Sequence, residues 1–156
     1  MAIYAKFGSI KGNVTTTGLE GWVELDSFNW GYAATSTQGH GASQYRDVTV
    51  NELVLTMKAE QASVDLAQFG LNRTNIGALE CKFTTTVQNK VDTFMNYKFT
   101  NCQIGRYSIA ADAQGMPVET LSFSFQTVNF TFTARDTKLV GMPKSVTYDL
   151  TSAKTS

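Results

Sequence analysis

The sequence is poor in the residues that carry most enzyme chemistry. Its single histidine, His40, lies between two glycines, Gly39 and Gly41. A catalytic histidine is normally oriented by a second group on a rigid element, and a glycine-flanked position does not provide one. Walker, H-E-x-x-H, G-x-S-x-G and EF-hand patterns are all missing. We expect a protein that is not an enzyme and uses no cofactor or metal, with His40 as a solvated loop residue or an interface contact.

An excess of charge of one sign is also missing. Thirteen Lys and Arg residues balance thirteen Asp and Glu residues, and the basic ones are dispersed. Nucleic-acid binding usually needs a basic stripe, because phosphate neutralisation drives affinity. We therefore expect no nucleic-acid partner. A net charge of zero keeps self-repulsion weak, so self-association at high concentration is not opposed.

Long apolar runs do not occur. No stretch approaches the roughly 20 apolar residues of a membrane-spanning helix, so we expect no membrane insertion. The first residues, MAIYAK, have the pattern of a strand and lack the basic and apolar regions of a secretory signal. We expect a protein that folds in the cytoplasm, and any export uses a route other than a cleaved signal peptide.

Cysteine is scarce, with only Cys81 and Cys102 present. Neither lies in a C-x-x-C motif, and the only histidine is distant in sequence, which disfavours a redox or metal site. We expect two small buried apolar residues in a reducing compartment. Their relative phase stays open, because Cys102 is out of phase with Phe99 unless a bulge intervenes.

β-Strand signals dominate what is present. Alternating apolar residues at 79–87 and at 95–99 predict two paired strands, joined by a turn within residues 88–92. The apolar phase flips within residues 25–28, 50–53 and 118–133, and each flip predicts a bulge or sharp bend. Strongly bent strands favour a mainly β fold, a closed or nearly closed antiparallel β-barrel. The length fits one domain over residues 1–156, of which residues 137–156 form a C-terminal extension.

One short helix is predicted, and an extension of its start by a few residues over 61–63 is left open. Ser63 is a suitable N-cap, Asp65 falls in the first turn and Gly70 can end the helix. Its apolar face would be formed by Val64, Leu66, Ala67 and Phe69. The helix is too short to be stable alone, so we expect it to plug or cover the barrel.

Two further segments stand out. Residues 33–47 contain no aliphatic side chain larger than Ala and predict a long polar loop, a kind of segment that often carries function. Near the C-terminus, Gly141-Met142-Pro143 predicts a break, followed by a short strand at 146–150. The aromatics Trp22, Phe28 and Trp30 are expected in the barrel core, with a subunit interface as the alternative.

Three blocks in this order resemble one known family. They are residues 21–31 (GWVELDSFNWG), residues 48–56 (VTVNELVLT) followed by 61–63 (QAS), and residues 117–125 (PVETLSFSF) running into Val128 and Phe130. Their order and spacing are similar to those of the haemolysin-coregulated protein (Hcp) family, the tube protein of bacterial type VI secretion. The end of the chain, from 141 to 151, is similar to the C-terminal extension of one Hcp subgroup.

The resemblance implies a fold and an assembly. Hcp proteins are small β-barrels with one short helix, a fold shared with phage tail-tube proteins. They form homohexameric rings that stack into a tube, which is tipped by a VgrG spike, driven out of the cell by a contractile sheath, and carries small effector proteins in its lumen. By analogy residues 34–47 would be the loop that contacts the next ring. The candidate contacts are Thr35, Ser36, Thr37, Gln38, His40, Ser43, Gln44 and Tyr45.

Two alternatives remain open at this point. The first is a tail-tube subunit of a phage or another contractile injection particle. The second belongs to a different class, a monomeric β-barrel module that binds a ligand. That module would remain a monomer in solution and would display exposed aromatic residues along a groove.

Overall fold

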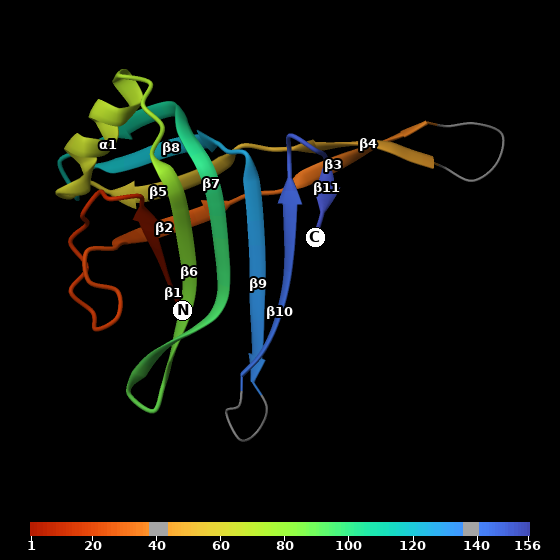
Figure 1. The fold of residues 1–156 in the computed structure, drawn as a ribbon. Helices are drawn as coiled ribbons and strands as arrows, with labels where there is room; N and C mark the ends of the chain where they lie inside the picture. Colours follow the sequence, from red (N-terminus) through yellow and green to blue (C-terminus); the bar gives the residue numbers. More distant parts are fainter. Residues whose placement is uncertain (38–43, 136–140) are drawn as a thin grey trace.

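The computed structural model of the protein describes residues 1–37, 44–135 and 141–156. Strands dominate this part of the chain, with helix α1 (Ala62–Leu71) placed between the fifth and sixth of them (Figure 1). The strands are β1 (Ala2–Phe7), β2 (Val23–Asn29), β3 (Tyr32–Thr37), β4 (Gln44–Val50), β5 (Leu53–Lys58), β6 (Gly77–Val87), β7 (Lys90–Ala110), β8 (Val118–Ser124), β9 (Thr127–Arg135), β10 (Gly141–Asp149) and β11 (Lys154–Thr155).

Six strands close into an antiparallel barrel. Around the ring the order is β7, β6, β1, β2, β5 and β8, and the pairing of β8 with β7 completes the circle. The expected barrel with one short helix is therefore confirmed. Strands β9, β10 and β11 continue from β7 as a sheet extension outside the ring, and β3 and β4 form a separate two-stranded sheet.

Strand β7 is shared between the barrel and the sheet extension. Over Met95–Thr100 it pairs with β9, and over Gln103–Ala110 it pairs with β8. Strands β8 and β9 thus run one after the other along the same edge of β7. The chain bends between them at Phe125 and Gln126. The predicted bend within residues 118–133 marks this departure from the barrel.

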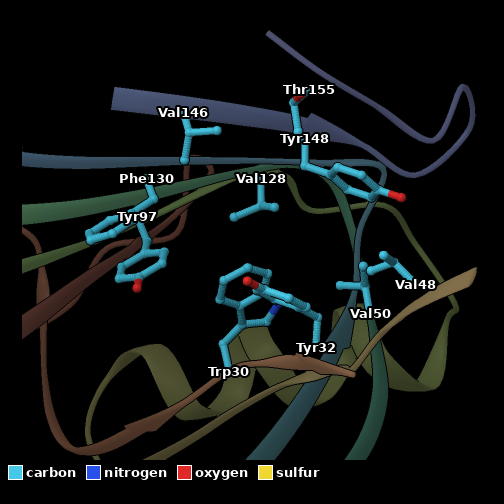
Figure 2. A pocket seen from close by; sticks show the side chains of 10 residues that line it. All are labelled: Trp30, Tyr32, Val48, Val50, Tyr97, Val128, Phe130, Val146, Tyr148 and Thr155. Carbon is cyan, nitrogen blue, oxygen red and sulfur yellow. The ribbon is translucent and has the colours of Figure 1, made fainter. Parts of the chain in front are cut away.

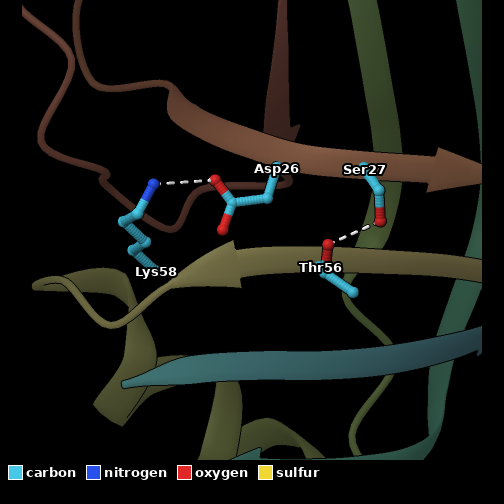
Figure 3. Close-up of polar contacts among 4 residues, drawn as sticks. All are labelled: Asp26, Ser27, Thr56 and Lys58. Atoms are coloured by element: carbon cyan, nitrogen blue, oxygen red, sulfur yellow. Dashed lines mark hydrogen bonds and ion pairs between the residues drawn. The ribbon is translucent and has the colours of Figure 1, made fainter. Parts of the chain in front are cut away.

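The phase flip at residues 25–28 is a β-bulge. Leu25 pairs with Met57 and Ser27 pairs with Thr56, so Asp26 is the extra residue of β2. The Asp26 carboxylate accepts a hydrogen bond from the Lys58 ammonium at 3.0 Å, and the hydroxyls of Ser27 and Thr56 are hydrogen-bonded beside it (Figure 3). The flip at 50–53 has another cause, because β4 ends at Val50 and β5 begins at Leu53.

The predicted β6–β7 hairpin is present, and its two predicted apolar faces lie opposite each other. Leu79 pairs with Phe99, and Cys81 pairs with Tyr97. The turn is shorter than predicted, because only Gln88 and Asn89 separate the strands, with φ of 50° and 61°. Two consecutive positive φ angles are typical of a type I′ turn, whose twist matches that of the paired strands.

Both cysteines are buried and free within the barrel, as expected. The register of β6 and β7 shifts beside Cys102, and Asn101 has a φ of 52°. The extra residue lets both Phe99 and Cys102 face the interior, which settles their relative phase. Burial raises the pKa of Cys81 well above its ordinary value and that of Cys102 to about 12, so both thiols stay protonated at neutral pH.

Helix α1 differs from its prediction at both ends and on one face. It continues past Gly70 to Leu71, and its C-cap is Asn72. Its N-cap is Gln61 and not Ser63, which lies in the first turn. Ala62 and Leu66 are buried, but Val64 is 74% exposed and is not part of the packed face. The hydroxyl of Ser63 instead hydrogen-bonds to Glu119 of β8, which anchors the helix to the barrel. Within the described residues, no helix has the length and apolarity needed to cross a bilayer.

Two segments that the sequence predicts to be irregular form strands in the structure. The segment 33–47, expected as a loop, contributes to β3 and β4, and Gly141-Met142-Pro143, expected as a break, begins β10. Thr, Val and Tyr favour the first pair of strands through β-propensity, which outweighs the lack of large aliphatic residues. Pro143 is tolerated because, among the described strands, β10 pairs only with β9 at this position, so a missing N–H on the other edge interrupts no described pairing.

A pair of glycine substitutions tests the barrel geometry. Gly8 follows β1 with a φ of +53°, and a Cβ atom there would overlap the backbone oxygen of Ile76. We expect Gly8→Ala to lower the free energy of unfolding by about 3 kcal/mol or more, because left-handed strain and overpacking add together. Gly18→Ala is the control: its φ is +86° but no atom lies within 4 Å of the new Cβ, so about 1–2 kcal/mol is expected. Urea unfolding measures both, and equal losses would contradict this packing.

Candidate assembly surfaces

The β3–β4 hairpin projects away from the barrel (Figure 1). Its pairing begins at Tyr32 with Val50 and continues to Thr37 with Gln44, with a register shift between Thr35 and Ser36. The hydroxyl of Thr35 donates to the backbone oxygen of Asp47 at 3.2 Å. Within the described residues this two-stranded sheet pairs with no other strand. A two-stranded ribbon is marginally stable by itself in water. Packing against a neighbouring surface would therefore increase its stability.

The predicted contact residues are distributed along this hairpin. Thr35, Ser36 and Thr37 lie on β3, whereas Gln44 and Tyr45 lie on β4. Thr35 is exposed, and the pairing of Thr37 with Gln44 places these two residues opposite each other toward the far end of the ribbon. The other three candidates, Gln38, His40 and Ser43, lie outside the described residues.

An apolar groove lies between the base of this hairpin and the β9–β10 sheet (Figure 2). Its volume is about 470 Å³. Four valines and Thr155 line it together with five aromatic residues, namely Trp30, Tyr32, Tyr97, Phe130 and Tyr148. We did not predict this groove from the sequence. The alternation of Val128, Phe130 and Phe132 indicates an apolar strand face, but the groove forms only where the separate β3–β4 sheet lies beside β9 and β10 in space.

The three aromatics of the sequence analysis occupy different environments. Trp22 is 9% exposed, and the Lys82 ammonium lies 4.7 Å from the centre of its ring. Phe28 packs against the core through Phe83 and Tyr97, with ring centres 5.1 and 4.9 Å apart. Both therefore belong to the barrel interior or its margin.

Trp30 lies at the edge of the core and faces the groove. Its ring centre is 6.2 Å from that of Tyr32 and 5.8 Å from that of Tyr97. Its indole nitrogen is buried and has no hydrogen-bond partner among the described residues. A buried donor without an acceptor costs free energy. The groove therefore contains a polar group whose hydrogen-bonding capacity is not satisfied within the described protein.

A buried carboxylate network joins the helix to the closing strands of the barrel. Glu119 of β8 is completely buried, and its two carboxylate oxygens accept hydrogen bonds from the hydroxyls of Ser63 and Tyr107. Burial, the hydrogen bond to Glu119 and the charge of Glu119 together raise the pKa of Tyr107 to about 12. The Tyr107 hydroxyl therefore remains a donor at any physiological pH. The network connects α1, β7 and β8, so its role is structural.

Glu60 lies beside this network, just before α1. One of its carboxylate oxygens accepts from the backbone N–H of Asn13 at 3.1 Å, and the other is buried and finds no hydrogen-bond partner in the described part of the chain. Burial raises the pKa of Glu60 above 4.5, and the neighbouring Glu119 adds to this, against the lowering effect of backbone hydrogen bonds from Asn13 and Ala62. The folded protein therefore holds a proton on Glu60 more tightly than the unfolded chain does.

The surfaces described above offer few reactive or metal-binding groups. Within residues 1–37, 44–135 and 141–156, no three His, Cys, Asp or Glu side chains are placed to hold a metal ion. The prominent surfaces are the free hairpin and the apolar groove, and both suit contact with another protein. Fold and surfaces together define the class of the chain, a small closed β-barrel with extended strands outside the ring.

Comparison with known proteins identifies the family. The family model described as "Type VI secretion system effector, Hcp" matches residues 4–132. The chain therefore belongs to the Hcp family of type VI secretion, a family of secreted proteins, and it is a structural protein and not an enzyme. A search of curated protein sequences found no significant match.

Solved structures share the fold. One described as a type six secretion system protein superposes with a TM-score of 0.90 at 24% identity, covering 99% of each chain. Hcp1 from Salmonella typhimurium gives 0.80 at 21% identity, covering 99% of this chain and 98% of its own. A type VI secretion system effector from Yersinia pestis gives 0.78 at 18% identity, covering 95% and 99%. At these identities the likeness establishes the fold.

Glu60 yields a prediction about pH. Because its pKa is raised in the folded state, its contribution to stability is present below pH 4.5 and is lost as the pH rises through the folded-state pKa. In Glu60→Gln this titration is removed. The stability of the wild type relative to the variant should therefore fall as the pH rises from about 4 toward about 7, and then become constant. Urea unfolding at each pH measures the difference, and a difference that grows in favour of the wild type contradicts the account.

Proposed function

We propose that this chain is the tube subunit of a type VI secretion system, forming homohexameric rings that stack into a hollow tube. Family membership supports a role in this secretion system. The observation that carries the stacking proposal is the β3–β4 hairpin, which pairs with no other strand in the described protein and extends beyond the barrel (Figure 1). One hairpin makes a modest contact, but six in each ring act together, and multivalency makes such contacts strong.

The remaining features of the proposal follow from this role. The partners would be other copies of the chain, a VgrG spike at the tip, contractile sheath proteins outside and small effector proteins in the lumen. The tube would assemble in the cytoplasm and leave the cell through the secretion apparatus. We propose the whole chain as one domain, with residues 137–156 as an extension that adds β10 and β11 beside β9. The balanced charge supports dense packing, since self-repulsion between copies is weak.

A monomeric ligand-binding module is the second candidate. The groove favours it, because five aromatic side chains line one cavity. Small-molecule sites, however, usually combine apolar walls with a few placed polar groups that fix the orientation of the ligand. Here the lining is almost wholly aliphatic and aromatic, with the tyrosine hydroxyls and Thr155 as its exceptions. The family match also favours type VI secretion over a phage tail tube.

The solution mass distinguishes these candidates. We expect light scattering across a concentration series to give about six times the 17.1 kDa of one chain, with ring-shaped particles in negative stain. A mass that stays at one protomer at the highest concentration contradicts the tube proposal and supports the binding module.

Paired charges introduced on the hairpin test stacking. Thr35 and Asp47 are exposed and pair across the ribbon, so Thr35→Glu with Asp47→Lys keeps a favourable cross-strand pair while changing the surface offered to the next ring. We expect rings of normal mass that no longer stack into tubes, seen by negative stain and sedimentation. The matched control is Thr86→Glu with Val91→Lys, which pair in the same way on the β6–β7 hairpin. Equal stacking in both variants, or equal loss, contradicts the role of the β3–β4 hairpin.

A further inference from the structure

Strand β10 is the outer strand of the sheet extension along most of its length (Figure 1). It pairs with β9 from Gly141 to Asp149, whereas β11 pairs only with Tyr148 and Asp149. Over residues 141–146 the outer edge of β10 therefore meets no strand in the described part of the chain. A strand edge with free N–H and C=O groups is a template on which another chain can pair.

The side chains beside this edge would favour such pairing. Phe132 of β9 is 44% exposed, and Met142 and Val146 of β10 are 62% and 45% exposed. By the alternation of the two paired strands, these three side chains share one face of the sheet. Two copies that met edge to edge along β10 would join these faces into one larger apolar surface. The net charge of zero would oppose that contact only weakly.

Two sets of hydrogen bonds show which backbone groups of β10 point outward. Thr147 donates to the backbone oxygen of Ser156 at 2.9 Å and accepts from the Ser156 N–H at 2.8 Å, so both of its groups face the outer edge. Leu150, three residues later, donates to the backbone oxygen of Gln126 at 2.9 Å, on the side of β9. Residues of an antiparallel strand alternate between its two edges, so the odd-numbered residues of β10 face outward.

A proline occupies the middle of the unpaired edge. Pro143 has the same parity as Thr147, so its backbone nitrogen faces outward, where it carries no hydrogen to donate. Between residues 141 and 146 the outer edge can therefore donate only from Gly141 and Ser145. Proline on an edge strand is one of the devices by which natural sheets disfavour further pairing.

Strand β11 covers the next part of the same edge. The chain folds back after β10, and the Asp149 carboxylate holds this turn by accepting from the backbone N–H groups of Thr151 at 2.8 Å and Ser152 at 3.4 Å. The turn places β11 against Tyr148 and Asp149. Because β11 has only two residues, it adds little packing of its own. Its main effect is to occupy backbone groups that would otherwise be open to another strand.

We propose that Pro143 and β11 together guard the outer edge of β10 and prevent it from pairing with β10 of a second copy. Pro143 removes a donor where the edge has no described partner, and β11 fills the edge beyond it. A second copy is the strand that the guard excludes, because two identical strands can pair antiparallel through the same surface on each. The inference goes beyond the proposed function and does not depend on it, since an unguarded edge would pair in a monomer as well as in a ring.

Opening the guard tests it. The opened variant combines Pro143→Val, which restores an N–H, with removal of residues 151–156, which uncovers the rest of the edge. The matched control combines the same truncation with Thr133→Val. Thr133 pairs with Pro143 across the sheet, so the control adds a valine on the same face without adding a donor. We expect sedimentation at equal concentration to give the opened variant a mass of about twice that of the control or more, with equal far-ultraviolet circular dichroism.

A second proline separates backbone pairing from apolar attraction. Ser145 also faces outward, so Ser145→Pro in the opened variant removes another donor and should return the mass to that of the control. Hydrogen exchange adds a direct readout, because the amides of Ser145 and Thr147 should exchange slowly in the opened variant and quickly in the control. Equal masses for the opened variant and its control, or a mass that Ser145→Pro leaves unchanged, overturn the guard.

Full-length variants provide the same test if the truncated chains fail to fold. Asp149→Ala removes the acceptor that holds the turn before β11. Pro143→Val with Asp149→Ala should therefore associate more than Thr133→Val with Asp149→Ala, and equal masses in this pair overturn the inference. Each comparison is made between a variant and its own control. A wild type that stays monomeric would thus contradict the tube proposal and leave the test of the guard unaffected.

Discussion

The structure depends on how strand β7 divides its edge between two partners. One edge pairs with β6, and the other pairs with β9 over Met95–Thr100 and with β8 over Gln103–Ala110. Pairing with β8 closes the barrel, because β8 also pairs with β5. Once that half of the edge is taken, β9 must lie outside the ring, and β10 and β11 follow it. A closed barrel and an open sheet extension therefore arise from one shared strand.

The surfaces that lie outside the barrel follow from this division of the β7 edge. The barrel satisfies its own strands and buries its core, with Phe7, Phe99 and Phe123 inaccessible to solvent. Within the part of the chain that the structure describes, the β3–β4 hairpin pairs with no other strand, and the groove with Trp30 lies between it and the sheet extension. A protomer built in this way buries its own core and leaves the hairpin and the groove open, which agrees with the proposed assembly into rings.

The amino-acid sequence predicted the barrel strands well, but it predicted the β3–β4 hairpin and the start of α1 less well. Alternation predicted the paired faces of β6 and β7, because a strand with one buried face repeats every two residues. The change of apolar phase within residues 118–133 likewise predicted the bend near Phe125. The segment 33–47 was predicted as a loop, since a ribbon without a buried face leaves no alternating pattern of large aliphatic residues. Ser63 was predicted as an N-cap, but long-range bonding to Glu119 determined its place.

The candidate surfaces depend on contacts that no local pattern encodes. Trp30 and Tyr148 are more than a hundred residues apart in sequence, yet they line one groove. The proposed hairpin contacts came from the family resemblance, whereas the groove depends on how the separate β3–β4 sheet lies against the sheet extension.

Hydrogen exchange of backbone amides tests the proposed assembly through the β3–β4 hairpin most directly, with the protein measured as dilute protomers and again under assembling conditions. The account predicts that amides of β3 and β4 exchange quickly in the protomer and slow markedly on assembly, whereas those of the β6–β7 ladder are protected in both states. Equal exchange of β3 and β4 in the two states would contradict the claim that assembly completes this surface.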